Sequence, residues 1–153
     1  MEKLTTHTRF VNLRQEPFDI YIGRGNRYGQ KGLYGNPYFR NDQNREAAIA
    51  QYIPYMKHKL MQNTAFMLEF LTLKDKTLGC YCKPKHCHGE VLISLLNYLF
   101  SHFNSTIKPL ALRASVQDPL SKEEALELHA DVNQLLMDYH YIKNKKVNES
   151  IDK

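Results

Sequence analysis

Features typical of membrane and exported proteins are missing from this sequence of 153 residues. Its longest apolar stretch, residues 91–103, is shorter than the roughly 20 residues that cross a bilayer, and polar side chains interrupt it. Residues 1–9 hold no apolar run behind a positive patch, so we expect no secretory signal. The three cysteines are an odd number crowded into residues 80–87, which does not suit a disulfide framework. These absences predict a cytoplasmic protein without a membrane partner.

The remaining composition is that of a folded protein with a basic surface. Apolar residues make up 42% and charged residues 24%, which argues against a disordered chain. The length suits one domain rather than two. We therefore predict a core domain over residues 1–104 and, over residues 105–153, a linker and a C-terminal helix packed on or extending from that core. The formal charge of +5 favours a polyanionic partner such as a nucleotide, a nucleic acid or an acidic protein.

Hydrophobic periodicity alternates between strand and helix along the chain. It predicts strands at 9–13, 19–22 and 77–82, and helices at 45–61, 64–73, 89–102 and from 121 to about 142. We expect Pro54 to kink or split the first helix, a capping box to start the last one at Ser121, and the tail 143–153 to fray. Prolines and turn-forming residues make 104–120 a linker. The pattern predicts an α/β fold, with a small, open, mostly parallel sheet flanked by helices and a C-terminal helical extension.

The first candidate site is a long loop, residues 23–37, which follows the second strand and holds five of the seven glycines. Glycine is needed where the backbone takes positive φ or approaches a ligand closely. Cations beside exposed amides suit a phosphate, and Tyr28 and Tyr34 could stack on a base. The loop has the spacing of neither a Walker loop nor a dinucleotide-binding fingerprint. The predicted ligand-binding residues are Gly23, Arg24, Gly25, Arg27 and Asn36.

The second candidate site is the cysteine motif at residues 78–91, and one interpretation is a metal site. Cys80 and Cys82 would point to the same face of a strand, and a turn at Pro84 would bring Cys87 and His88 back beside them. Three thiolates and one imidazole can hold zinc in a closed tetrahedral site. The spacing C-x-C-x4-C-H is not that of a standard zinc finger. Zinc is therefore a candidate cofactor, with Cys80, Cys82, Cys87 and His88 as its ligands.

The other interpretation of this motif is catalytic. Cys87 precedes a helix, whose unpaired amides and dipole stabilise a thiolate, and His86, His88 and Lys85 lie close in sequence. Glu90 could act as a general acid or base, or hold a ribose hydroxyl, although it could also simply complement the helix dipole. The catalytic candidates are Cys87, His88 and Glu90.

Both motifs follow strands, and open α/β sheets bind ligands at the carboxyl ends of their strands. We therefore expect one cleft, with Arg24 and the Asn36-Pro37 turn on one wall and the helix after Cys87 on the other.

Three motifs occur in order along the chain: Y-I-G-R at 21–24, G-N-P at 35–37, and L-G-C-Y-C-x-P-x-x-C-H-G-E-V-L at 78–92. In this combination the sequence resembles an uncharacterised family of bacteriophage and bacterial proteins, the domain of unknown function 4326. Tyr81 stands where that family commonly has tryptophan, and Glu90 where it commonly has aspartate. The resemblance covers roughly residues 8–103 and implies a phage or bacterial setting without implying a reaction.

Two functions remain open. The leading hypothesis is a phage-type protein that acts on a nucleotide or nucleic acid, with the basic glycine loop holding phosphate opposite the Cys/His/Glu site; whether it is an enzyme stays undecided. The alternative is a non-enzymatic, zinc-stapled module that binds nucleic acid or a host protein, with the helix after Ser121 as a docking element.

Overall fold

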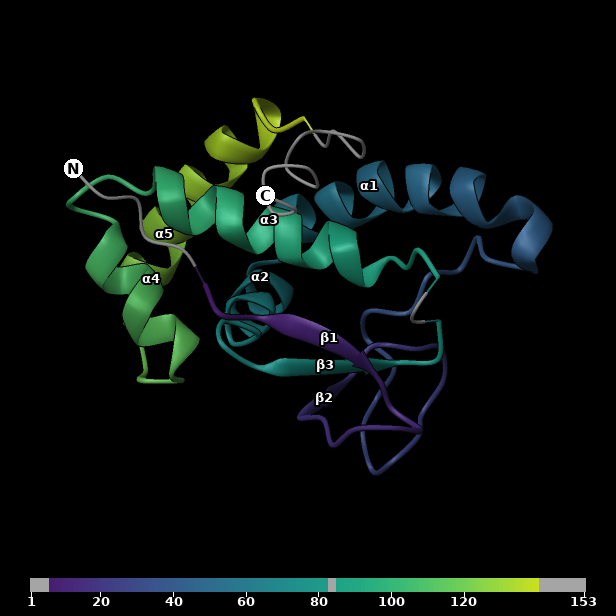
Figure 1. Cartoon of the computed structure of the whole chain (residues 1–153). Coiled ribbons are helices and arrows are strands. Elements are labelled where there is room, and N and C mark those ends of the chain that lie inside the picture. Colours follow the sequence, from purple (N-terminus) through teal and green to yellow (C-terminus); the bar gives the residue numbers. More distant parts are fainter. Residues whose placement is uncertain (1–5, 83–84, 141–153) are drawn as a thin grey trace, which may run out of the picture.

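The computed structural model describes residues 6–82 and 85–140. Helices alternate with three short strands (Figure 1). In chain order the elements are β1 (Arg9–Asn12), β2 (Ile20–Tyr21), the 3-10 turn η1 (Asp42–Asn44), α1 (Arg45–Gln62), α2 (Thr64–Leu71), β3 (Thr77–Cys80), α3 (Gly89–His102), α4 (Lys108–Ser115) and α5 (Lys122–Met137). The predicted α/β fold is confirmed.

The three strands form one parallel sheet with β3 in the middle, in the order β1-β3-β2. Val11 and Tyr21 both pair with Gly79, so the carboxyl ends of the strands reach the same edge. β2 is only two residues long, and the Gln30 side chain bonds to the backbone there: it accepts from the Tyr21 amide at 2.8 Å and donates to the Asp19 carbonyl at 3.0 Å. The segments after the strands therefore emerge together, and α3 begins beside them (Figure 1).

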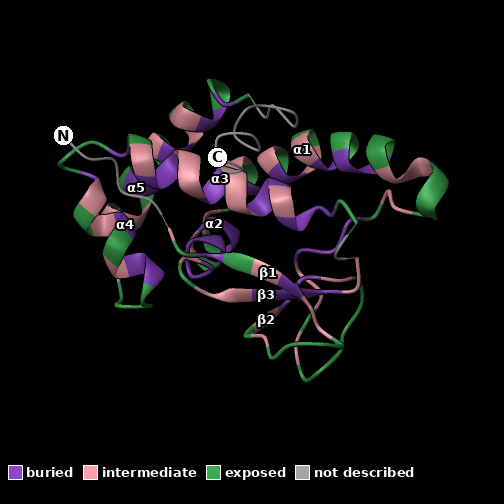
Figure 2. Ribbon diagram, in the orientation of Figure 1, coloured by how far each residue is buried: buried purple, intermediate pink, exposed green. Residues whose placement is uncertain are grey.

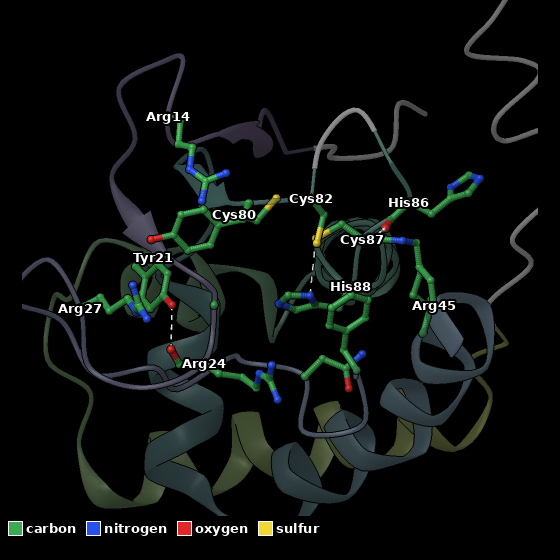
Figure 3. Close-up of a pocket in the computed structure, with 15 residues that line it drawn as sticks. Arg14, Tyr21, Arg24, Arg27, Arg45, Cys80, Cys82, His86, Cys87 and His88 are labelled. Atoms are coloured by element: carbon green, nitrogen blue, oxygen red, sulfur yellow. Dashed lines mark hydrogen bonds between the residues drawn. The ribbon is translucent and has the colours of Figure 1, made fainter. Parts of the chain in front are cut away.

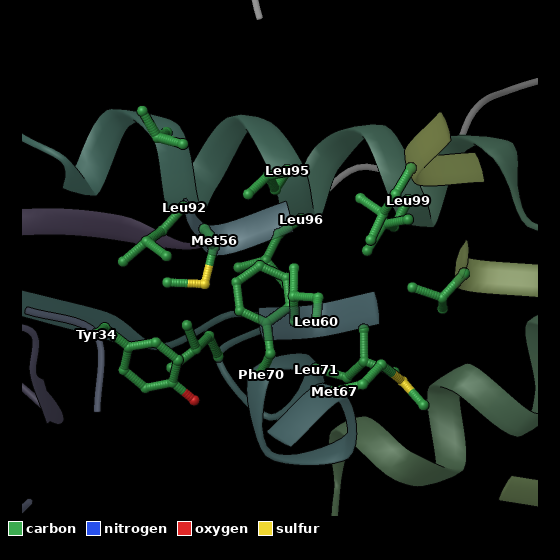
Figure 4. Packing of buried hydrophobic residues seen from close by; sticks show 14 of the residues in the cluster. Tyr34, Met56, Leu60, Met67, Phe70, Leu71, Leu92, Leu95, Leu96 and Leu99 are labelled. Carbon is green, nitrogen blue, oxygen red and sulfur yellow. The ribbon is translucent and has the colours of Figure 1, made fainter. Parts of the chain in front are cut away.

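The core lies where the helices pack on one another and on the sheet (Figure 2). Helical spacing puts Leu92, Leu95 and Leu96 of α3 in one buried cluster with Leu60 of α1 and Phe70 of α2 (Figure 4). All five side chains are fully excluded from solvent. Ala48 and Ile49 near the start of α1, and Val91 near the start of α3, are buried too, so the packed core fixes where both helices begin.

The segment predicted to be a linker is partly helical, and here the prediction was wrong. Pro109 lies in the first turn of α4, where a backbone N–H has no intrahelical partner to lose. The Asn104 side chain accepts from the amides of Thr106 and Ile107 just before the helix, and Ala111 and Ala114 are buried against the core. The prolines therefore mark the start and end of a short helix instead of an unstructured crossing.

The last helix, α5, begins as predicted, with a capping box between Ser121 and Glu124. It ends at Met137, before the predicted residue 142. Residues of α4 and α5 belong to the same buried cluster as those of α1 to α3, whereas independent folding of residues 1–104 stays a prediction. The expected tail at 143–153 and the turn at Pro84 lie outside the described residues.

The longest described helix, α1, runs unbroken through Pro54, whose side chain is exposed. The predicted split at this proline is therefore absent. Within residues 6–82 and 85–140, no helix is long and apolar enough to span a membrane.

Candidate functional site

A pocket of 390 Å³ opens at the carboxyl edge of the sheet (Figure 3). Segments that follow all three strands line it, and so do the start of α1 and the turn that enters α3. Arg24 from the glycine loop and His88 from the cysteine motif both face this one cavity, as the strand-end argument predicted. The two motifs therefore share a pocket, although Arg24 and His88 are 64 positions apart in the sequence.

His88 links the two motifs directly. Its Nε2 lies 2.6 Å from the carbonyl oxygen of Ile22, the residue that precedes the glycine loop. A carbonyl can only accept, so Nε2 carries the hydrogen and Nδ1 carries a lone pair. Nδ1 lies 3.5 Å from the Cys87 sulfur. The imidazole packs edge-on against the Tyr52 ring, with 5.0 Å between the two ring centroids. Burial lowers the pKa of His88, so the side chain is a neutral imidazole of fixed orientation.

The glycines of the loop serve mainly the loop's own folding. Gly25 and Gly29 have φ of 76° and 71°, which side chains with a Cβ rarely adopt. A Cβ on Gly35 would lie 2.8 Å from the Cα of Arg24. The lack of a side chain at Gly35 therefore lets the backbone at the end of the loop pack against the backbone at its start. Gly25 is exposed and is not among the residues that line the pocket, whereas the other four predicted ligand-binding residues are: Gly23, Arg24, Arg27 and Asn36.

Asn36 has both ends of its side chain occupied. Its amide donates to the Ala48 carbonyl of α1 at 3.0 Å, and its oxygen accepts from the Tyr38 amide at 3.0 Å. Asn36 therefore fastens the end of the glycine loop to α1 and borders the pocket from there. Tyr34, predicted to stack on a base, is buried in the core against Phe66, because the loop turns inward at that point.

Four arginines and no described carboxylate line the pocket. Arg14 lies over the Tyr81 ring at 4.7 Å, and Arg45 donates to the His86 carbonyl at 2.8 Å and pairs with Asp42. Arg24 differs, since its side chain has no hydrogen bond, ion pair or contact with an aromatic ring among the described residues, and only its carbonyl oxygen is bonded. The guanidinium carbon of the fourth arginine, Arg27, lies 6.0 Å from the centroid of the Tyr81 ring. The pocket is thus positively charged and suits an anion.

Sequence reasoning missed Arg14 and Arg45. Arg14 could have been found, because it follows the end of β1 much as Arg24 follows the end of β2, and parallel strands place such residues side by side. Nothing in the local sequence around Arg45 separates it from an ordinary residue in the first turn of a helix.

The three thiols gather at one side of the pocket, and none is in a disulfide. Cys80 and Cys87 are each 1% exposed, whereas Cys82 is half-buried. Hydrogen bonds from Cys80 and Cys87, with a further one from Arg45, hold the pKa of Cys82 far below its usual range. The hydrogen bonds that Cys87 shares with Cys80 and Cys82 raise the pKa of Cys87. Of the two thiols, Cys82 therefore has the lowered pKa, whereas the sequence pointed to Cys87.

Glu90 does not line the pocket. Its carboxylate accepts from the Cys87 amide at 3.3 Å and lies 3.0 Å from Nδ1 of His86. Both contacts stabilise the first turn of α3, as a carboxylate at a helix N-terminus does. Of the three predicted catalytic residues, Cys87 and His88 face the cavity, and Glu90 supports the turn behind them.

The four residues of the zinc interpretation, Cys80, Cys82, Cys87 and His88, all line the pocket. Within the described residues, no group of three or more cysteine, histidine, aspartate or glutamate side chains has an arrangement that could hold a metal ion. Zinc coordination by Cys80, Cys82, Cys87 and His88 stays a prediction.

A family model described as a domain of unknown function, DUF4326, matches residues 6–98, which is more than half of the chain. The chain belongs to the DUF4326 family. This confirms the resemblance carried by the three motifs. A relative from Enterobacteria phage T4, the "Uncharacterized 12.4 kDa protein in nrdA-td intergenic region", is 32% identical over 92 residues, which cover 60% of this chain and 80% of the relative. No solved structure matches the chain.

The DUF4326 region contains the whole candidate site. Every residue that lines the pocket, from Arg14 to His88, lies within the matched residues 6–98. Helices α4 and α5 lie beyond that region and contribute to the core without reaching the pocket. The lining of the pocket therefore comes entirely from the region that the family model matches.

Proposed function

We propose that the pocket binds a nucleotide by its phosphate groups and that the thiols and His88 act on the bound ligand. The observation that carries this proposal is the convergence of four arginines on a cavity with no described carboxylate in its lining. Guanidinium groups match phosphate oxygens in shape and charge and are the side chains most used for phosphate recognition.

Two further features support a phosphorylated ligand of nucleotide size. The volume of 390 Å³ lies in the range of about 300–1,000 Å³ that is usual for small-molecule sites. The aromatic side chains of Tyr81 and Phe39 border the cavity and offer surfaces for a base.

The reactive groups lie beside the proposed phosphate site. Cys82 and Cys87 face the cavity, and the lone pair on Nδ1 of His88 is directed at Cys87. A neutral imidazole next to a thiol can take up its proton, which is the arrangement that nucleophilic catalysis uses. Glu90 acts on this group only through the amide of Cys87 and the ring of His86.

The test is a calorimetric titration of the purified protein with nucleoside mono-, di- and triphosphates. We expect binding that weakens as salt concentration rises, because arginine–phosphate attraction is screened. A nucleoside without phosphate is the matched control and should give no heat. Binding of a single-stranded oligonucleotide in preference to every free nucleotide would move the ligand to nucleic acid, and absence of binding by all of them would contradict the proposal.

A substitution at Gly35 tests whether the loop positions Arg24 for this ligand. The methyl group of Gly35→Ala would lie 2.8 Å from the Cα of Arg24, so the Arg24 backbone has to move. We expect nucleotide affinity to fall about tenfold, since the guanidinium is displaced from the geometry that hydrogen bonding requires. Gly29→Ala, which strains the exposed end of the loop where no atom lies within 4 Å, is the control for general loop strain. Equal losses in both variants would show that loop strain, not Arg24 placement, decides affinity.

A second candidate function, the zinc-stapled module that binds nucleic acid or a host protein, is favoured by one specific observation. His88 donates from Nε2 to a backbone carbonyl and leaves Nδ1 toward the thiols, which is how metal-binding histidines are commonly oriented. Metal analysis of purified protein with titration of its thiols separates the two functions. Stoichiometric zinc with masked thiols supports the module, and metal-free protein with reactive thiols supports the nucleotide site.

A further inference from the structure

We propose that Cys82, rather than Cys87, is the nucleophile of the pocket, and that it attacks an electrophilic centre of an anionic ligand held by the surrounding arginines. This inference rests on the proposed function, because it takes the pocket to be the place where the ligand is bound. It names the sulfur of Cys82 as the reacting atom, whereas the sequence motif pointed to Cys87.

Accessibility is the first argument. A nucleophile has to reach its substrate, and Cys82 is the half-buried thiol of the three, while Cys80 and Cys87 are each 1% exposed. Cys82 follows the end of β3, so its side chain belongs to the carboxyl edge where the pocket opens. Figure 3 shows Cys82 next to Cys87, whose sulfur the dashed line joins to the ring of His88.

The surroundings of the sulfur are the second argument. Arg45 lines the same pocket as Cys82 and is held in place by the His86 carbonyl at 2.8 Å and by Asp42. Arg14, Arg24 and Arg27 line this pocket as well, so the sulfur of Cys82 faces a cavity surrounded by guanidinium groups. Partly exposed cysteines beside an arginine are the ones that react, and buried cysteines are usually inert.

The neighbouring groups then take supporting roles. The Cys87 sulfur lies 3.5 Å from Nδ1 of His88, and both residues line the same cavity as Cys82. A thiol and an imidazole in contact can hold or return a proton beside the reacting sulfur. His88 and Cys87 are thus positioning residues for the sulfur of Cys82.

The chemistry can be tested without knowing the natural ligand, using two small electrophiles that differ in charge. In both iodoacetate and iodoacetamide, the thiolate sulfur attacks the methylene carbon, a carbon–sulfur bond forms, and iodide leaves with the electron pair of the carbon–iodine bond. Iodoacetate carries a carboxylate, and iodoacetamide is neutral. An ordinary thiolate has no reason to prefer the anionic reagent, whereas a thiolate surrounded by arginines does.

The experiment treats the full chain with limiting amounts of each reagent and locates the modified cysteine by peptide fragmentation. The chain has only three cysteines and all belong to this site, so the assignment is direct. We expect Cys82 to be modified first and iodoacetate to react with it about tenfold faster than iodoacetamide, as electrostatic steering of this size is common. Cys82→Ser should abolish the fast reaction, and Arg45→Gln should remove the preference for iodoacetate.

The outcomes separate this inference from the proposed function. First modification of Cys87, or equal rates of both reagents at Cys82, overturns the inference even when nucleotides bind. Thiols that react only after a chelator is added also overturn it, in favour of a metal site. If Cys82 is modified fast and selectively by iodoacetate but the protein binds no nucleotide, Cys82 is the nucleophile and the proposed nucleotide ligand is wrong. Locating the modified cysteine in the unaltered protein is enough to test the inference. A variant that fails to fold therefore does not change the result.

Discussion

Replacing Arg24 with alanine is expected to reduce nucleotide affinity about 100-fold and to leave the stability of the protein unchanged. The side chain lines the pocket, is exposed, and has no hydrogen bond or ion pair to any described residue, so its guanidinium is available to a phosphate. Each hydrogen bond to a charged group contributes about 1.5–3 kcal/mol, and about 2.7 kcal/mol corresponds to the 100-fold change. Calorimetric titration gives the affinity, and urea unfolding gives the stability.

The backbone explains why the loop should survive this substitution. The contact that Arg24 makes within the fold comes from its carbonyl oxygen, which accepts from the Tyr21 hydroxyl at 2.7 Å and is unaffected by the change. Arg9→Ala is the matched control. Arg9 begins β1, at the end of the strand away from the pocket, and among the described residues its side chain forms an ion pair with Glu16 at the surface. Equal loss of affinity in both variants would mean that net charge, and not a placed guanidinium, attracts the ligand.

The meeting of the two motifs could be predicted because it follows from topology. Parallel strands end at a common edge, and the sequence shows a strand immediately before each motif. The parallel order β1-β3-β2 then brings residues as distant as Arg24 and His88 to one cavity. Arg14 follows by the same reasoning, once the loop after β1 is included.

The roles of individual groups at the site could not be predicted in the same way. Helix position alone favours a charged Cys87, but the structure buries that sulfur and leaves Cys82 half-exposed beside Arg45. Burial and three-dimensional contacts set the pKa of each thiol, and a linear motif contains neither. α4 was missed for a related reason, because the prolines that suggest a linker also fit the first turn of a helix.

His88→Ala should destabilise the protein by about 3 kcal/mol, the sum of an unsatisfied buried carbonyl and a cavity. The ring is buried against Tyr52, and its Nε2 hydrogen is donated to Ile22 at 2.6 Å. Without it the start of the glycine loop loses its link to α3, so nucleotide binding should weaken together with stability. Urea unfolding measures the first effect and calorimetric titration the second.

His88→Gln separates the structural role of this residue from its chemical role. The glutamine amide can donate in place of Nε2, so we expect stability to fall by only about 1 kcal/mol, while the lone pair facing Cys87 is lost. The two proteins should also differ in pH dependence. Burial lowers the pKa of His88 in the folded state, so unfolding takes up a proton below the ordinary value of about 6.5. The stability advantage of the unaltered protein over His88→Gln should therefore shrink as pH falls from about 8 to about 5. An advantage that stays constant or grows over this range would show that His88 is not held as a neutral imidazole, and the proton-accepting role of Nδ1 would fall with it.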